Sequence, residues 1–363
     1  MQLKVNDHAR ISHYLVFYMI NAVQIATGIL GFQRYISIHA GYDGWIAVIL
    51  AGILFHILIW IMYKMLNRSK GDLISIHQEL FGKWLGGALS IFFTFYFSLQ
   101  AISILSSFAM IYRVWMFPDL SNWEFAFIYL ILVYYAVSKG FRVIAGVCFF
   151  GVVLPSFLMI TYIPPFFYGD FRHLLPLFTH SYQEILAATK QMTYSYLGIE
   201  TLLIFYPFIK NPEKSQQWAH YGNLYTLFVY LVITISSFVY YSEEKLSHSI
   251  WATLTMWKIV SLPVVDRFEV IGLTIWILVV LPNMCLLVWS SGRIVKRVAN
   301  IPQKIFLPII LIMLYIPICM MNDLETTKYV TDITGRIGFY LVYAYIPLLA
   351  ILYLSYKKVR KPE

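Results

Sequence analysis

The chain has 363 residues, of which 60% are hydrophobic and only 12% are charged. Soluble proteins contain roughly 45–50% apolar and 25% charged residues, so this composition excludes a soluble globular domain. Apolar runs long enough to cross a ~30 Å hydrocarbon core recur along the whole chain. These runs are continuous and do not alternate with a period of two, which excludes a β-barrel. The sequence therefore predicts an all-α polytopic membrane protein.

The apolar runs divide into ten predicted membrane-spanning helices. Their approximate bounds are 11–36, 43–63, 84–112, 121–138, 143–166, 186–209, 219–241, 270–292, 304–321 and 334–356. The first run is longer than the apolar region of a signal peptide and has no small-residue cleavage site, so we expect a retained helix. We expect a single transmembrane domain over residues 1–363, with one half at 1–166 and the other at 186–356.

The net charge of +9 follows the predicted topology. If the N-terminus is cytoplasmic, most of the 27 basic residues lie in cytoplasmic segments and most of the 18 acidic residues lie on the other side. Excess Lys and Arg in cytoplasmic loops is the positive-inside rule. An even number of spans then places both termini in the cytoplasm. Because topology explains the basic charge, we expect no nucleic-acid partner.

Two further segments are amphipathic and too polar to span. Residues 71–83 are expected to form a cytoplasmic interfacial helix, and residues 247–262 are expected to form a helix on the outer side. Such helices lie along the membrane interface or cap a cavity. Pro164 and Pro165 are expected to end the fifth span, since proline cannot continue the helical hydrogen-bond pattern.

Two of the predicted spans contain sequences that favour a break in the helix. The first carries IATGILGFQR at 25–34, and the sixth carries YSYLGIETLLIFYPF at 194–208. Each glycine weakens a helix by roughly 1 kcal/mol relative to alanine, and a break releases amide and carbonyl groups that can bind a ligand. Glycine is also common where membrane helices simply pack closely. Interrupted helices at corresponding places in two halves nevertheless indicate a transporter-type central site.

Glu200 lies in the middle of the second of these sequences. A carboxylate at bilayer depth costs at least ~2.5 kcal/mol, so such residues face a cavity, a partner or free backbone groups. Two hypotheses stay open. In the first hypothesis, Glu200 takes up a proton or binds a ligand amine. In the second, it is a fixed hydrogen-bond partner for N–H groups released where the first helix unwinds.

Several other polar residues fall inside predicted spans. They are Asn21 and Gln24 before the first break, Gln100 and Ser103 in the third span, and Asn283 after Pro282 in the eighth. Each by itself is more typical of an ordinary hydrogen bond between helices than of a ligand contact. Nucleotide-binding glycine motifs and the HExxH zinc motif are absent. We therefore expect no catalytic residues, no metal site and no cofactor.

Four short motifs occur in the order and spacing of a known family. They are DGW at 43–45, GKWLG at 82–86, SYLGIETLLIFYP at 195–207 and DRFE at 266–269. With them, nearly the whole chain resembles the B subunits of spore germinant receptors, the GerAB-like family of the amino acid–polyamine–organocation transporter superfamily. The resemblance implies a five-plus-five inverted repeat, LeuT-like, with helices 1 and 6 broken at the centre.

The resemblance also implies a function and partners. The family acts as a nutrient sensor in the inner membrane of dormant endospores, beside a larger A-type membrane subunit and a C-type lipoprotein. The expected ligand is a small-molecule germinant such as an amino acid. The alternative function is a proton- or sodium-coupled amino acid transporter.

The resemblance further implies a ligand pocket between the two breaks. The residues expected to line it are Ala26, Thr27, Gly28, Ile29, Gln100, Leu197, Gly198, Ile199 and Asn283, with Glu200 directly after them. This chain departs from the family pattern GxGxLxLP in the first helix, because Ala26 replaces the first glycine and Gln33 replaces the proline. The Ala26 methyl group narrows the pocket, so the resemblance does not identify the ligand.

Overall fold

The structure is a computed structural model that describes residues 5–260 and 266–359 of the chain. Seven helical stretches in this part are long and apolar enough to cross a membrane: Phe32–Ser69, Leu73–Trp115, Phe141–Tyr168, Pro212–Tyr240, Phe268–Val298, Gln303–Met320 and Leu324–Val359. Three shorter apolar helices, Leu15–Gln24, Asn122–Ser138 and Ile199–Phe208, complete the set. These ten segments follow the predicted spans in chain order. The chain is thus an integral membrane protein of helical architecture.

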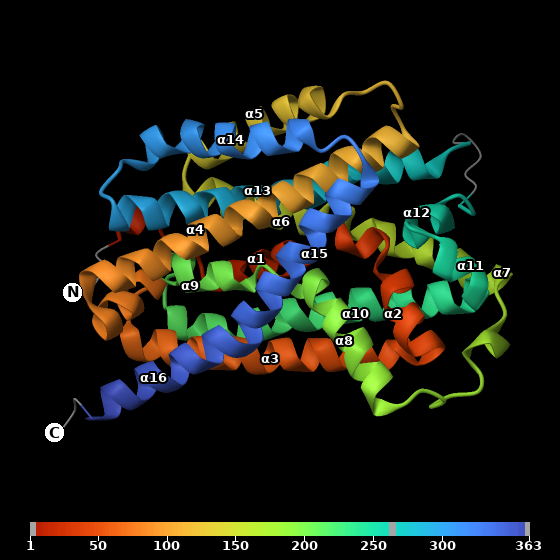
Figure 1. Ribbon diagram of the computed structural model, residues 1–363, viewed down its shortest axis with the longest axis horizontal. Helices are drawn as coiled ribbons and strands as arrows, with labels where there is room; N and C mark the ends of the chain where they lie inside the picture. The colour runs from red at the N-terminus through yellow and green to blue at the C-terminus, as the bar shows by residue number, and fades with distance from the viewer. Residues whose placement is uncertain (1–4, 261–265, 360–363) are drawn as a thin grey trace.

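Most of the long helices run roughly along one direction, with both termini at one end of the bundle and α7, α11 and α12 at the other (Figure 1). The α-helices are α1 (Leu15–Gln24), α2 (Phe32–Ala40), α3 (Gly44–Ser69), α4 (Leu73–Trp115), α5 (Asn122–Ser138), α6 (Phe141–Val153), α7 (Pro164–Tyr168), α8 (Tyr182–Tyr196), α9 (Leu202–Phe205), α10 (Ser215–Tyr240), α11 (Glu243–His248), α12 (Ala252–Trp257), α13 (Phe268–Val298), α14 (Gln303–Met320), α15 (Leu324–Tyr340) and α16 (Ile346–Val359). Termini at one end agree with an even number of crossings. The side of the membrane on which they lie stays a prediction.

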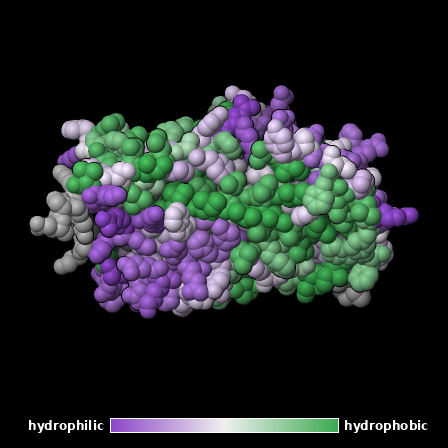
Figure 2. Space-filling view, turned by 90° about the horizontal axis from the view of Figure 1, so that it is seen from below, coloured by the Kyte–Doolittle hydropathy of each residue, from purple (hydrophilic) through white to green (hydrophobic). Residues whose placement is uncertain are grey.

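The short helices α1 and α9 and the C-terminal end of α8 lie inside the bundle, between long helices that pack around them. The helix α10 packs against α1 and α3, while α13 packs along α4 and also contacts α1. Figure 2 shows an extended hydrophobic surface on one side of this bundle, with hydrophilic side chains gathered toward the end that holds the termini. Long helices with apolar outer surfaces therefore enclose the two short, broken ones.

Both predicted breaks are confirmed. The helix α1 ends at Gln24, the next residue is extended, and a 3₁₀ turn at Gly28–Leu30 leads into α2. The helix α8 ends at Tyr196, and Leu197 is extended. Gly198 then has a φ of 109°, a left-handed conformation that favours glycine, before a 3₁₀ turn at Ile199–Thr201 and α9.

The amphipathic segment predicted at 71–83 is helical and forms the first part of α4. It begins at Leu73 and is separated from the membrane-spanning part by a bend at Gly82, whose φ of 77° is not helical. The bend lets one part lie at an angle to the other without a loop. The predicted amphipathic segment therefore exists, although it is continuous with the third span.

The single outer helix predicted at 247–262 is wrong over the described residues. Two short helices, α11 and α12, replace it, and 261–262 lie outside the described residues. Trp251 between them has a non-helical backbone, and the Ile250 carbonyl lies so close to Gly31 that a Cβ there would be 2.1 Å from its oxygen. This close approach to the first break interrupts the helix.

The prediction that the proline pair ends the fifth span is also wrong. The helix α6 ends earlier, at Val153, and a 3₁₀ helix from Pro155 to Tyr162 continues the span. Pro164 and Pro165 then form the first turn of α7. Proline is tolerated in a first turn because its missing N–H has no helical partner there.

Candidate functional site

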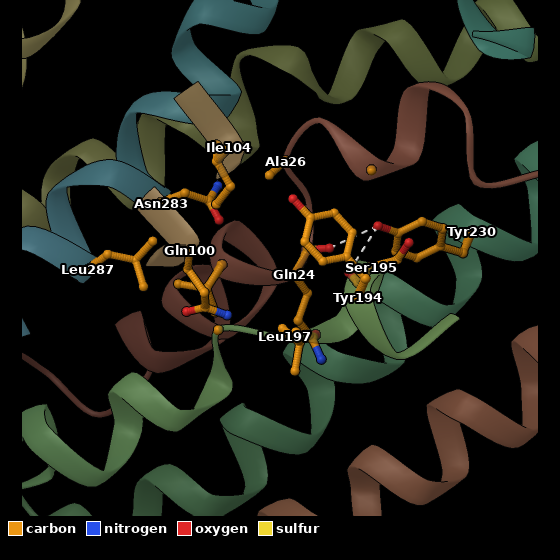
Figure 3. A pocket seen from close by; sticks show the side chains of 13 residues that line it. Gln24, Ala26, Gln100, Ile104, Tyr194, Ser195, Leu197, Tyr230, Asn283 and Leu287 are labelled. Atoms are coloured by element: carbon orange, nitrogen blue, oxygen red, sulfur yellow. Dashed lines mark hydrogen bonds between the residues drawn. The ribbon is translucent and has the colours of Figure 1, made fainter. Parts of the chain in front are cut away.

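A small cavity lies between the two broken helices, at the centre of the bundle (Figure 3). The residues that line it are Val23, Gln24, Ala26, Gly28, Gln100, Ile104, Tyr194, Ser195, Leu197, Gly198, Tyr230, Asn283 and Leu287. Six residues of the predicted pocket are among them: Ala26, Gly28, Gln100, Leu197, Gly198 and Asn283. The volume open to the centre of a water molecule is about 20 Å³, which is room for about one water.

Three predicted pocket residues lie elsewhere. Thr27 faces a larger cavity described below, and Ile29 lines a separate cavity beside Tyr162 and Trp276. Ile199 is buried but does not line the central cavity. A break turns successive side chains in different directions, so a contiguous run of residues could not all face one cavity.

The sequence missed several lining residues. Tyr194 and Ser195 lie in the sequence of the second break, yet neither was assigned to the pocket. Tyr230 lies in the middle of α10 and has no local feature that marks it. Gln24 was expected to form only a bond between helices. It forms that bond, with Asn223, and also lines the cavity.

The backbone carbonyls released at the first break accept hydrogen bonds from side chains of other helices. Asn283 Nδ2 donates to the oxygens of Ala22 (2.7 Å) and Ile25 (3.0 Å). Trp276 Nε1 donates to the oxygen of Ala26 at 3.0 Å. Buried backbone groups without partners are costly, so these donors stabilise the unwound segment.

The Tyr230 hydroxyl joins the two breaks. It lies 3.0 Å from the carbonyl oxygen of Gln24 and 3.1 Å from that of Ser195 (Figure 3). One phenol hydrogen is thus shared between the last residue of α1 and a residue near the end of α8. This contact fixes the separation of the two broken helices on one side of the cavity.

Glu200 is fully buried and directly supports the second break. Its carboxylate accepts hydrogen bonds from the Gly198 N–H at 2.6 Å and from the Tyr96 hydroxyl at 3.0 Å. Gln100 Nε2 in turn donates to the Tyr96 oxygen at 3.0 Å. The N–H partner of Glu200 therefore belongs to the second break, not to the first as one hypothesis held.

A larger cavity, the vestibule, opens at the end of the bundle opposite the termini. Its volume open to water centres is about 650 Å³. Residues of α2, α8 and α15 line it, together with Ile250 and Trp251 from the α11–α12 connection. Gly28, Tyr194 and Ser195 line both the vestibule and the central cavity, so these residues separate the two.

Hydrogen bonds between hydroxyl groups hold this separating layer closed. The Tyr194 hydroxyl on α8 lies 3.0 Å from Ser103 Oγ on α4, and Ser103 Oγ lies 2.9 Å from Thr331 Oγ1 on α15. Three helices are thus connected by side-chain hydroxyl groups in the layer between the two cavities.

A bundle of membrane-spanning helices with two broken helices around a central cavity defines a protein of transporter architecture. The chain is similar in structure to MhsT, solved in complex with L-phenylalanine, with a TM-score of 0.62 and 11% sequence identity over 94% of this chain and 97% of that one. MhsT has the LeuT fold. This likeness confirms the predicted fold of inverted five-helix repeats, while the bounds of each repeat stay a prediction.

The chain belongs to the spore germination protein family, which matches residues 10–328. The spore germination protein GerQB of Bacillus cereus is 40% identical over 352 residues, which is 97% of this chain and 98% of that protein. The spore germination protein YndE of Bacillus subtilis (strain 168) is 22% identical and covers 92% of this chain and 93% of its own length. The family predicted from the short motifs is confirmed.

Proposed function

We propose that this protein is the nutrient-sensing subunit of a spore germination receptor and that it binds a small molecule, such as an amino acid, in the central cavity. One observation carries the proposal. The cavity is formed by both broken helices and is closed off from the vestibule by the layer around Tyr194. Such a site senses a ligand because entry requires the layer to open and occupancy then changes how the helices pack. Membership of the germination family and the L-phenylalanine bound to MhsT support this function.

The cavity volume of about 20 Å³ constrains how binding occurs. An amino acid is larger than one water, so the lining side chains must move apart. We infer that Tyr194 moves first, because its hydroxyl bonds are exchangeable for water from the vestibule. Ligand binding is therefore coupled to a change in α8 and α15, which a partner subunit can detect.

Sensing is favoured over cation-coupled transport by the hydrogen bonds at the end of α1. The released carbonyls of Ala22, Ile25 and Ala26 accept from Asn283 and Trp276. Each of these oxygens thus already accepts a side-chain N–H, which makes it a weaker ligand for a sodium ion. Coupling to protons through Glu200 is the form of the transporter alternative that remains to be tested.

Binding is tested by thermal stabilisation of the purified protein against a panel of amino acids, sugars and nucleosides. The informative variant is Gly28→Leu. The atoms nearest to a Cβ at Gly28 would be Ser195 Oγ at 3.3 Å and two Tyr194 ring atoms at 3.6 Å, so a leucine there first meets side chains of the cavity wall and takes up cavity space.

Gly146→Leu is the matched control, because a Cβ at Gly146 has nothing within 4 Å. We expect at least one compound to raise the melting temperature of the parent and of the Gly146→Leu variant but not of the Gly28→Leu variant. Equal stabilisation of all three proteins would refute the central site.

The remaining parts of the proposal concern assembly and location. We propose that an A-type membrane subunit and a C-type lipoprotein are partners, that the complex lies in the spore inner membrane, and that both termini are cytoplasmic. Co-purification from spore membranes and germination assays in strains without the A-type subunit test the partners. A normal germinant response from this chain alone would overturn the receptor role and favour the transporter. Cysteine labelling at the termini tests the orientation.

A further inference from the structure

Two glutamines from different helices, each with a carbonyl oxygen that is unpartnered in the described chain, line the central cavity. Gln24 is the last residue of α1 and is 1% exposed, and Gln100 lies in α4 and is 4% exposed. Both line the cavity. The Oε1 atom of each is buried and has no hydrogen-bond partner within the part of the chain that the structure describes. Buried polar side-chain atoms normally have partners, so two such atoms in one cavity need an explanation.

The orientation of the Gln24 amide is fixed by a chain of hydrogen bonds. Asn223 Nδ2 donates to the Gly52 carbonyl at 3.0 Å, which can only accept. The Asn223 Oδ1 atom is therefore left to accept from Gln24 Nε2 at 2.8 Å. Because Gln24 Nε2 donates to Asn223 of α10, Gln24 Oε1 is the amide atom that has no partner among the described residues.

A second chain fixes the Gln100 amide in the same way. The single hydrogen of the Tyr96 hydroxyl goes to the Glu200 carboxylate, so the Tyr96 oxygen must accept from Gln100 Nε2. The free end of Gln100 is again the carbonyl oxygen. Glu200 thus acts on the cavity through Tyr96 and is a positioning residue for Gln100.

Several backbone acceptors close to the cavity already have donors. The Gln24 and Ser195 carbonyls accept from Tyr230, and the Ile25 carbonyl accepts from Asn283. None of the thirteen lining residues in the described chain has a charged side chain. The cavity therefore offers free acceptor oxygens but no charge to balance a charged ligand.

We propose that the Gln24 and Gln100 carbonyl oxygens recognise N–H donors of a ligand that has no net charge. This inference rests on the proposed function and specifies its ligand. Two sources supply that chemistry. One is the ammonium group of a zwitterionic amino acid, whose own carboxylate balances its charge, and the other is the amine of a neutral compound such as a nucleoside.

The probes are pairs that differ in the amine. L-alanine and L-phenylalanine are compared with propionate and 3-phenylpropionate, and adenosine is compared with purine riboside, which lacks the exocyclic amine. Affinity for each member is measured by isothermal calorimetry on the full-length protein in nanodiscs. The pair in which the amine-bearing member binds identifies the source of the N–H donors.

The variants are Gln24→Met and Gln100→Met, which keep the side-chain length and remove the acceptor. We expect each to lower affinity for the amine-bearing member by about tenfold or more, and to change affinity for its partner without the amine by less than about threefold. Gln217→Met is the control, because Gln217 is exposed on α10 and bonds only to Tyr221. The ratio of the two affinities separates recognition from a general loss of structure.

Gln100→Glu and Glu200→Gln keep the test valid if a methionine variant fails to fold. Gln100→Glu retains an acceptor oxygen and should retain preference for the amine. In Glu200→Gln, the new side-chain NH₂ group can donate to the Tyr96 oxygen. The Tyr96 hydroxyl then donates to the Gln100 oxygen, and the Gln100 nitrogen becomes the free end of that amide. The preference for the amine-bearing ligand should therefore fall.

The outcomes are distinct. Suppose that a compound binds the parent and that Gly28→Leu abolishes its binding. If the ratio of affinities with and without the amine is then unchanged in both methionine variants, this inference is wrong and the central site stands. Equally tight binding of the members with and without the amine would also overturn this inference and leave the central site intact. If no probe binds the parent, this inference is wrong, while the central site is decided by the thermal panel with Gly28→Leu and Gly146→Leu.

Discussion

The two breaks look alike in sequence but are stabilised in different ways. In the second break, backbone groups bond to side chains of the break itself. Glu200 accepts from the Gly198 N–H, and the hydroxyl of Thr201 donates to the Gly198 carbonyl at 2.8 Å. The first break depends on distant side chains, chiefly Asn283 and Trp276 of α13. The second break is therefore a local structure that the chain carries with it, whereas the first exists only inside the assembled bundle.

This difference assigns different roles to the two halves of the site. A locally stabilised break keeps its backbone conformation around Leu197 and Gly198 when α8 shifts as a unit. A break held by other helices changes when those helices move, so α13 and α10 can transmit ligand binding at the first break to the rest of the bundle. Substitutions in each region separate the two roles.

The largest effect is expected for Gly198→Ala. A φ of 109° strains any other residue by about 1–3 kcal/mol, and the new Cβ would lie 2.8 Å from the Val23 carbonyl oxygen. We expect a marked loss of folded protein, measured by the monodisperse yield and the melting temperature in detergent. Gly140→Ala is the control, since Gly140 has a φ of 95° but nothing within 4 Å of its Cβ position. Equal losses in both variants would show that strain alone, and not the contact between the breaks, is responsible.

The next effect concerns the carboxylate of the second break. Glu200→Ala leaves the Gly198 N–H and the Tyr96 hydroxyl without an acceptor, at about 1–3 kcal/mol for each buried group. Glu200→Gln keeps one acceptor oxygen, so its melting temperature should fall much less than that of Glu200→Ala. If both variants fold as well as the parent but neither responds to ligand, a titrating role for Glu200 is supported and the structural role is contradicted.

Asn283→Ala tests the dependence of the first break on α13. The carbonyls of Ala22 and Ile25 lose their donor, and we expect a destabilisation of about 1–3 kcal/mol together with loss of ligand-induced stabilisation. Hydrogen exchange should increase over residues 22–28 but not over 197–201. Increased exchange in both segments would show that the two breaks are not independently stabilised.

Tyr230→Phe is expected to have the smallest effect on stability and to sharpen the comparison most. It removes only the hydroxyl that joins Gln24 and Ser195, and hydrogen bonds between membrane helices contribute on average about 0.6 kcal/mol. The fold should survive with a melting temperature near that of the parent, while the ligand-induced shift becomes smaller because the two breaks no longer move together. Tyr225→Phe, at a residue of α10 that does not line the central cavity, is the matched control.

The sequence by itself determined the membrane-spanning class, the spans and the two breaks of this protein. Hydropathy and glycine placement are local properties, and they act through the cost of burying polar backbone and of holding a strained φ. The DGW, GKWLG and SYLGIE motifs likewise identified the family, and the break at Gly198 followed from its own neighbours.

Only the tertiary structure decided which side chains complete the site. Tyr230 and Asn283 bond to groups of the first break that lie more than two hundred residues away in sequence. The hydrogen bonds that orient Gln24 link α1, α10 and α3, and those that orient Gln100 link α4 to the 3₁₀ turn at Ile199–Thr201. Such partners have no local pattern, because a hydrogen bond depends on where two groups meet in space. The same reason explains why Ile29 and Ile199, both expected in the pocket, do not line the central cavity: the direction of each side chain at a break is set by packing against the surrounding helices.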